Sequence, residues 1–452
     1  MDELELKGEW WLKEMAEDSD DIIPDDAVAG TLSFSPETGG NLELIGGFYH
    51  PFELFKDDDE DTNGPVTIHG VSTDGEYVSL LDCMYTNGGA NSKDITFRTE
   101  TYEIGQIIRG GFVDKNTRYW KCSFSFDNLD KWTGLRTVAV PGDFDVAPGP
   151  SLTAEASTDE ADIILNVHED IHYPVGTPVG RVYFTVYVDQ PLTQKEFSSR
   201  YIRPLQNLVT LGVGEPVFPT FLNLYSERYG PYESQHKATH RVSYYREQED
   251  ISSQQMDFTL QDLDFETSVK QWHTHYNDVK RLHHNYFGTE YNDKMYVRTQ
   301  FFSLMSALEA YHRAAFPDRQ KIMTKSVFDR FKSTLFPRIP SVAARERIEN
   351  LVNSIGNEPS IGDRLLDITG RHESVFPREY DIESNLSTIK KIRHNIVHSL
   401  SEEYTTTEIA EAKILLRIVV LAVLLDTVGL DDAKSREILK EEYESADRIV
   451  PL

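Results

Sequence analysis

One short segment near the C-terminus combines two side chains suited to phosphate chemistry. Residues 392–398 read Ile-Arg-His-Asn-Ile-Val-His. The planar guanidinium of Arg393 can give two charge-assisted hydrogen bonds to a phosphate. His398 carries an imidazole with an unperturbed pKa near ~6.5, which suits general acid or base work. Because Arg-x4-His occurs often by chance, the spacing alone does not establish a site, and the surrounding elements must support it.

The helical periodicity of this segment indicates where its arginine points. If residues 386–400 form a helix, their Leu, Ile and Val side chains share one broad face, and Arg393 projects from the middle of it. A cation among apolar side chains is costly unless it meets a carboxylate or a phosphate. Arg393 and His398 lie about 140° apart round the helix. We therefore expect them to converge only at the edge of the face, where a second helix packs.

A long helical region surrounds the segment. From about residue 257 the apolar period changes from 2 to 3.6, which predicts an all-α domain over 257–452. The expected helices are 265–287, 295–316, 324–335, 342–355, 386–400, 409–428 and 434–444. Helix 409–428 follows a capping pattern at Thr405 to Glu408 and is apolar nearly all round. It is therefore expected at the centre of the core or in a dimer interface.

Residues 1–256 are predicted to form a β-rich domain. Short alternating or β-branched runs separated by Gly, Asn and Asp turns are typical of a sandwich or barrel, and we expect a sandwich-like arrangement. The predicted strands are 30–34, 41–48, 66–71, 77–85, 95–102, 119–126, 163–167, 182–188, 221–225 and 240–245. A capping box from Thr193 to Glu196 predicts an amphipathic helix within this domain.

Composition restricts the location and the partners of the chain. A formal net charge of −30 over 452 residues disfavours nucleic acid as a general partner, although a local basic face can coexist with it. Cys83 and Cys122 lack metal-type spacing and are expected to be buried thiols in a reducing cytosol. The N-terminus lacks the pattern of a secretory signal. The longest apolar stretch, 414–425, is shorter than the ~20 residues that span a bilayer. We expect a cytoplasmic protein without a membrane partner.

Two segments of the helical region resemble HEPN domains. Residues 301–312, Phe-Phe-Ser-Leu-Met-Ser-Ala-Leu-Glu-Ala-Tyr-His, resemble the first core helix of these domains, in which an acidic residue lies on an otherwise apolar face. Here that residue is Glu309. Residues 392–398 resemble the HEPN Arg-x4-6-His motif that precedes a hydrophobic last helix. Together with segments 8–11, 28–32 and 41–44, they make the chain resemble the ApeA family of antiphage defence proteins.

This resemblance implies a specific activity. It implies an abortive-infection toxin whose HEPN domain is a homodimeric endoribonuclease that needs no metal or cofactor and uses the 2′-hydroxyl of the RNA as nucleophile. Arg393 and His398 would be catalytic, Glu309 would hold Arg393 through an ion pair, and His394 and Asn395 would support them. The β-rich domain would sense a phage-derived trigger or restrain the helical dimer.

A locally basic region offers a surface for the RNA. Between residues 319 and 347 the basic side chains are Arg319, Lys321, Lys325, Arg330, Lys332, Arg338, Arg345 and Arg347, and Lys390 and Lys391 lie beside the motif. The candidates for RNA binding are Lys321, Lys325, Arg330, Lys390 and Lys391. Such cations are equally compatible with ordinary solvated helix faces.

Two other functions remain open. The acidic balance of the chain favours a non-catalytic HEPN scaffold that binds RNA or protein. A β-domain that binds carbohydrate or peptide, with a helical tail for dimerisation, is the third possibility. In that case the aromatic residues of the β-domain, Trp10, Trp11, Trp120 and Trp132, would form a ligand platform rather than pack in the core.

A group of histidines is a further candidate site. His273, His275, His283 and His284 fall on the helix expected over 265–287. His273 and His275 would point to different sides of that helix, which suits a metal poorly. We expect a polar helix face there.

Overall fold

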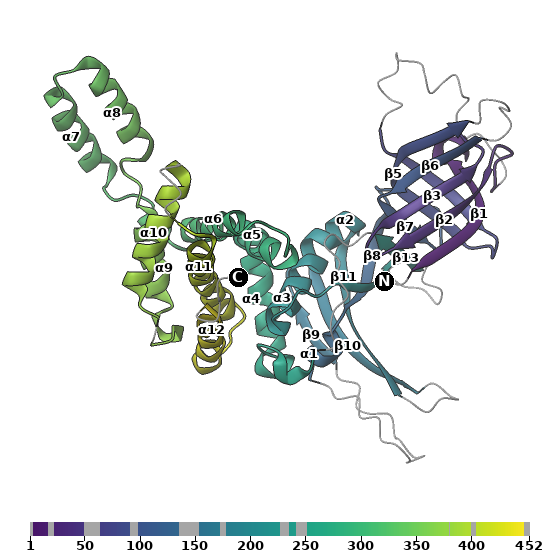
Figure 1. The fold of residues 1–452 in the computed structure, drawn as a ribbon. Coiled ribbons are helices and arrows are strands. Elements are labelled where there is room, and N and C mark those ends of the chain that lie inside the picture. Colours follow the sequence, from purple (N-terminus) through teal and green to yellow (C-terminus); the bar gives the residue numbers. More distant parts are fainter. Residues whose placement is uncertain are drawn as a thin grey trace. The chain divides into compact units, whose positions relative to one another are not determined.

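The computed structural model describes most of the chain (Figure 1). The described residues are 3–16, 22–48, 64–90, 98–134, 153–171, 178–226, 235–240, 251–378, 380–398 and 404–446. The chain divides into two compact units, Met1–Glu266 and Thr267–Leu452. The first is β-rich and the second is helical, which confirms the predicted fold class.

The first unit begins with a closed ring of antiparallel strands. Its members are β1 (Leu4–Leu12), β2 (Val28–Ser35), β3 (Gly39–Ile45), β4 (Val66–Ser72), β5 (Tyr77–Ala90) and β6 (Arg98–Ile104). In the order β1-β2-β3-β6-β5-β4 each strand pairs with the next, and β4 pairs with β1, which closes the ring. Alternate side chains, among them Trp10, Leu32 and Leu80, fill the interior. The sequence was typical of a sandwich or a barrel, and the closed ring β1–β6 is a barrel.

The same sheet continues beyond the ring. The further strands are β7 (Gln106–Arg109), β8 (Arg118–Phe126), β9 (Thr153–Ser157), β10 (Ala161–Ile171), β11 (Pro178–Thr193), β12 (Pro219–Tyr225) and β13 (Gln235–His240). β5 pairs with β7 as well as β6, and the order then runs β7-β13-β12-β8-β11-β10-β9. The predicted strand 240–245 overlaps β13 at His240, and residues 241–245 lie outside the described residues.

A helical segment buries the apolar face of this second part. The capping box at Thr193 and Glu196 forms as predicted and begins α2 (Gln194–Phe197). A π-turn, Ser198–Ile202, then leads into α3 (Arg203–Val213), which is buried along most of its length. The short helix α1 (Leu129–Trp132) contacts both α3 and β11, and its Trp132 is fully buried. Cys83 and Cys122 are free and buried, as expected, and burial raises the pKa of both thiols.

The second unit is entirely helical within the described residues. Its helices are α4 (Phe265–Asp278), α5 (Lys280–Tyr291), α6 (Val297–Ala315), α7 (Lys325–Leu335), α8 (Val342–Ile355), α9 (Ile361–Arg371), α10 (Ile382–His398), α11 (Thr406–Thr427) and α12 (Asp432–Ala446). The expected helix 265–287 is divided, because the backbone of Val279 leaves the helical region (φ −129°, ψ 47°). α9 was not among the helices expected from the sequence.

α11 is the centre of this unit. It contacts α6, α10 and α12 and is buried on nearly every side, so it is a core helix rather than an exposed dimerisation face. The capping box at Thr405 and Glu408 forms as predicted. Arg417, the cation of the apolar stretch, pairs with Glu290 of α5 at 3.1 Å and with Glu442 of α12. Within the described residues, no helix is long and apolar enough to cross a membrane.

Candidate active site

α10 carries the arginine–histidine segment and packs on both α9 and α11. Leu386, Ile389 and Ile392 are buried, so the apolar stripe predicted for this helix is present. These three side chains fix the rotation of α10 about its own axis, and this rotation determines where Arg393 emerges.

Arg393 emerges beside Glu309 of α6. Its guanidinium Nη2 lies 3.8 Å from Glu309 Oε1, so the acidic residue and the arginine of the motif meet although they are 84 positions apart in sequence. Arg393 is less buried than the stripe predicted, since its side chain is 41% exposed and that of Glu309 is 33% exposed. The long side chain reaches the solvent edge of the helix, where a guanidinium keeps much of its hydration.

This exposure limits what the ion pair contributes to folding. A pair open to solvent is screened and stabilises a protein by about 1 kcal/mol or less. The contact therefore orients the guanidinium rather than holding the unit together. Because both groups remain accessible, an incoming phosphate can compete for Arg393 without first breaking a buried salt bridge.

The other residues of the motif are described in part. His394 is exposed on α10, and His398 is the last residue of that helix. The side chains of Asn395 and His398 lie outside the described residues. The structure therefore brings Glu309 and Arg393 together and places the backbone of His398 on the same helix as Arg393.

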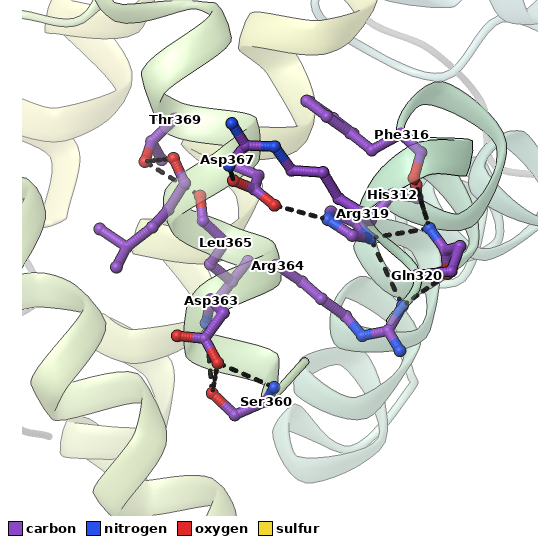
Figure 2. A network of polar contacts seen from close by, with 11 residues as sticks. His312, Phe316, Arg319, Gln320, Ser360, Asp363, Arg364, Leu365, Asp367 and Thr369 are labelled. Atoms are coloured by element: carbon purple, nitrogen blue, oxygen red, sulfur yellow. Dashed lines mark hydrogen bonds and ion pairs between the residues drawn. The ribbon is translucent and has the colours of Figure 1, made fainter. Parts of the chain in front are cut away.

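A polar network holds the C-terminal end of α6 against α9 (Figure 2). His312 is fully buried, and its Nε2–H donates to Asp367 Oδ2 at 3.0 Å. On the opposite side of the ring, Nδ1 lies 3.4 Å from Nη1 of Arg364, which is also buried. A guanidinium only donates hydrogen bonds, so Nδ1 must carry a lone pair. The contacts thus define a neutral imidazole protonated on Nε2.

The chain that leaves α6 is held by the same network. Arg319 pairs with Asp367, and the side chain of Gln320 donates to the carbonyl of Phe316 at 2.8 Å. Arg364 Nη2 reaches Glu358 at 3.4 Å. α9 is thereby joined to both ends of the segment between α6 and α9, and it also contacts α10. α9 and α11 therefore both connect α6, which carries Glu309, to α10, which carries Arg393.

Sequence reasoning missed this network, although one signal for it was present. Ser360 caps α9 and forms a capping box with Asp363 (Figure 2). The same pattern was recognised at Thr193 and Thr405 with the usual glutamate, but here the third position is aspartate. A buried histidine such as His312 gives no comparable signal, because its partners lie at distant positions in the sequence.

The basic candidates occupy different environments. The side chain of Lys390 lies over Gly362, where a Cβ atom would be 1.6 Å from its Cε. Hydrogen bonds from Ser360 lower the pKa of Asp363, and the charge of Lys390 adds a smaller contribution in the same direction. Lys391 is exposed on α10. Lys321 pairs with Glu358 at 3.4 Å. Lys325 and Arg330 are exposed on α7.

The polar helix face predicted for the four histidines is wrong for two of them, His275 and His283, whereas His284 is exposed. His283 is fully buried, and its Nε2 lies 3.0 Å from Nδ1 of His275. In one straight helix, residues eight positions apart would be about 12 Å apart, so the break at Val279 brings the rings together. Burial lowers the pKa of His275 to about 4 and lowers that of His283 well below its usual value. Within the described ranges, no three His, Cys, Asp or Glu side chains gather as metal ligands would.

These features define the class of the protein. A helical unit that faces an acidic residue of one core helix with the arginine of an Arg-x4-His helix, followed by an apolar core helix, is a HEPN-type domain. Family models agree: the Apea-like HEPN model matches residues 302–434, and the ApeA N-terminal domain 1 model matches residues 5–272. The chain belongs to the ApeA family. Searches of curated proteins and of solved structures found no match.

Proposed function

We propose that this chain is an antiphage defence effector whose HEPN domain cleaves RNA without a metal. The observation that carries the proposal is the contact between Glu309 and Arg393, because it puts a solvent-accessible guanidinium beside the helix end that bears His398. Membership of the ApeA family supports the defence role. We propose that the protein acts in the cytoplasm, where RNA is available.

The proposed reaction is an intramolecular attack within the RNA. The 2′-hydroxyl oxygen forms a bond to the adjacent phosphorus while the bond from phosphorus to the 5′-oxygen breaks, which gives a 2′,3′-cyclic phosphate and a 5′-hydroxyl. One proton leaves the 2′-oxygen and one is delivered to the departing 5′-oxygen. His398 is assigned to this proton transfer as base or acid. Arg393 stabilises the extra negative charge that develops on the phosphate.

The remaining candidates have supporting roles in this proposal. Glu309 orients Arg393, and the exposed His394 and its neighbour Asn395 contact the phosphate or orient His398. A homodimer would bring two copies of the motif together, and the β-rich unit would control this arrangement in response to a phage-derived trigger.

A cleavage assay tests the nuclease. Purified protein is incubated with total RNA in excess chelator, together with the variants Arg393→Ala and His398→Ala. We expect fragments from the wild type and none from either variant, with unchanged circular dichroism. We expect the same variants to lose phage protection in plaque assays. Full cleavage by Arg393→Ala would overturn the proposal.

A non-catalytic scaffold is the second candidate function. The net charge of −30 favours it, since a strongly acidic chain repels RNA over most of its surface. In that case the wild type would leave RNA intact in the same assay, and the Arg393→Ala variant would still protect cells from phage.

A further inference from the structure

α7 and α8 form a helical hairpin (Figure 1), and hydrogen bonds join the two chain segments at its base. Ile322 N–H donates to the carbonyl oxygen of Asn357 at 3.0 Å. The side chain of Asn357 accepts from Met323 N–H at 2.7 Å and donates to Met323 C=O at 2.9 Å. On either side of this clamp, Gln320 is bonded to His312 of α6 and to Arg364 of α9, and Glu358 is bonded to Arg364. The hairpin 321–357 therefore leaves the HEPN core at a defined position.

Beyond its base the hairpin has very little core. Of its described side chains, Phe328 is the buried one, and several large apolar groups are exposed. These are Ile322, Val327, Phe331, Val342 and Leu351. The apolar face of an amphipathic helix normally packs against another element. Exposed apolar side chains grouped on one element therefore indicate a contact surface.

The charge of the hairpin is opposite to that of the rest of the chain. Residues 321–357 contain seven Lys and Arg and three Asp and Glu, a formal charge of +4, in a chain of −30. The remaining residues therefore carry −34. A polyanion is repelled by most of this protein and attracted at the hairpin.

The structure separates the basic side chains of the hairpin into two groups. Lys321 pairs with Glu358, Lys332 with Asp329 and Asn353, and Arg345 with the carbonyl of Ile339. The second group is exposed and makes no ion pair within the described part of the chain. It consists of Lys325, Arg330, Arg338 and Arg347. The first group supports the hairpin, whereas the second is available to a ligand.

We propose that the α7–α8 hairpin is an arm that binds single-stranded RNA and delivers it to the HEPN site. Its four available cations, Lys325, Arg330, Arg338 and Arg347, contact phosphates. Phe331, which is 40% exposed and adjacent to Arg330, offers a ring on which an unpaired base stacks. Because stacking needs a base outside a duplex, the arm favours single strands. That the bound RNA is a substrate rests on the proposed nuclease.

The fixed base of the hairpin relates the arm to the active site. His312 of the network and Glu309 of the site lie one turn apart on α6. RNA held along the arm is therefore presented at a constant position relative to Arg393, which a flexible basic tail would not achieve.

A binding assay tests the arm independently of cleavage. The probe is a short fluorescein-labelled RNA with 2′-O-methyl riboses, which cannot be cut by 2′-hydroxyl attack, and the readout is fluorescence anisotropy over a range of salt concentrations. The test variant is K325S/R330S/R338S/R347S in the full chain. The matched control, K280S/R281S/K294S/R298S, removes four exposed cations of the same unit that lie outside the hairpin.

The expected result is a change in salt dependence. Each phosphate contact to a single strand contributes about 0.7 to the slope of log Kd against log salt, so the hairpin variant is expected to lose up to about 3 units of slope. The control variant is expected to keep the wild-type slope. The same salt-dependence slope in hairpin variant and wild type would overturn the proposal. It would also be overturned if light scattering showed that the hairpin variant loses a dimer while its RNA binding is unchanged, because the arm would then be a contact to a second copy of the chain.

This experiment distinguishes failure of the RNA-binding arm from failure of the proposed nuclease. RNA binding that depends on the hairpin, without cleavage of ordinary RNA, would contradict the nuclease and leave the arm in place. Cleavage of ordinary RNA, together with a salt-dependence slope that is the same in hairpin variant and wild type, would support the nuclease and contradict the arm.

Discussion

Replacing His312 by alanine tests how the HEPN unit positions its active-site helix. The imidazole bonds to two charged groups, Asp367 and Arg364, in a fully buried position. Hydrogen bonds to charged groups contribute about 1.5–3 kcal/mol each, so we expect H312A to lower the free energy of unfolding by about 3–6 kcal/mol. For a unit the size of Thr267–Leu452, each kcal/mol lowers Tm by about 2–4 °C.

The tautomer of His312 supplies a discriminating control. If the ring is neutral with its proton on Nε2, D367N keeps an oxygen that can accept this hydrogen bond, and it loses the charge of the acceptor and the contact with the exposed Arg319. We expect D367N to cost about 1–2 kcal/mol, less than H312A. Both variants are measured by urea unfolding at neutral pH. Equal losses in H312A and D367N would refute the neutral-histidine account, because they would show that a charge–charge interaction dominates.

Two further predictions concern other buried groups of the same unit. The pKa of His275 in the folded protein is about 4, below the usual 6.5, so the folded state binds fewer protons than the unfolded state between these values and loses stability as pH falls from about 6.5 to 4. We expect the wild type to lose about 3 kcal/mol of unfolding free energy between these pH values, and H275F not to show this loss. Urea unfolding at both pH values measures it, and the same pH dependence of stability in wild type and H275F would contradict the prediction. For Arg417, which pairs with Glu290 and Glu442, R417M removes the guanidinium that contacts both partly buried carboxylates, and we expect a loss of about 3–5 kcal/mol, whereas a change below about 1 kcal/mol would show that the pairs contribute little.

Local patterns predicted much of the fold. Capping boxes at Thr193 and Thr405 marked helix starts that the structure contains, and alternating runs marked most strands. β4 and β5 form a local hairpin, but closure of the barrel also depends on the pairing of β4 with β1, which is a long-range choice that alternation along one strand does not encode. The division of the first long helix depends on the backbone of a single residue, Val279, whose side chain is compatible with helix.

The candidate site shows the same limit. The apolar stripe indicated that Arg393 needs an acidic partner or a phosphate, and the resemblance to HEPN domains identified Glu309 as that partner, which the structure places 3.8 Å away. The network of His312 and Arg364 was not, since each member is an ordinary polar residue of its own helix until α9 packs against α6. The paired and available cations of the hairpin were likewise indistinguishable in sequence, because only the fold places Glu358 beside Lys321.

The most direct test of the central claim is the fate of a defined RNA with one 2′-deoxy nucleotide at its cleavage site. In chelator, the wild-type chain is expected to cut the all-ribose RNA and to leave a 2′,3′-cyclic phosphate and a 5′-hydroxyl, which mass spectrometry identifies. The 2′-deoxy substitution removes the nucleophile and is expected to abolish the cut at that position. Cleavage of the deoxy-substituted bond, or products that end in a 3′-hydroxyl, would contradict the account.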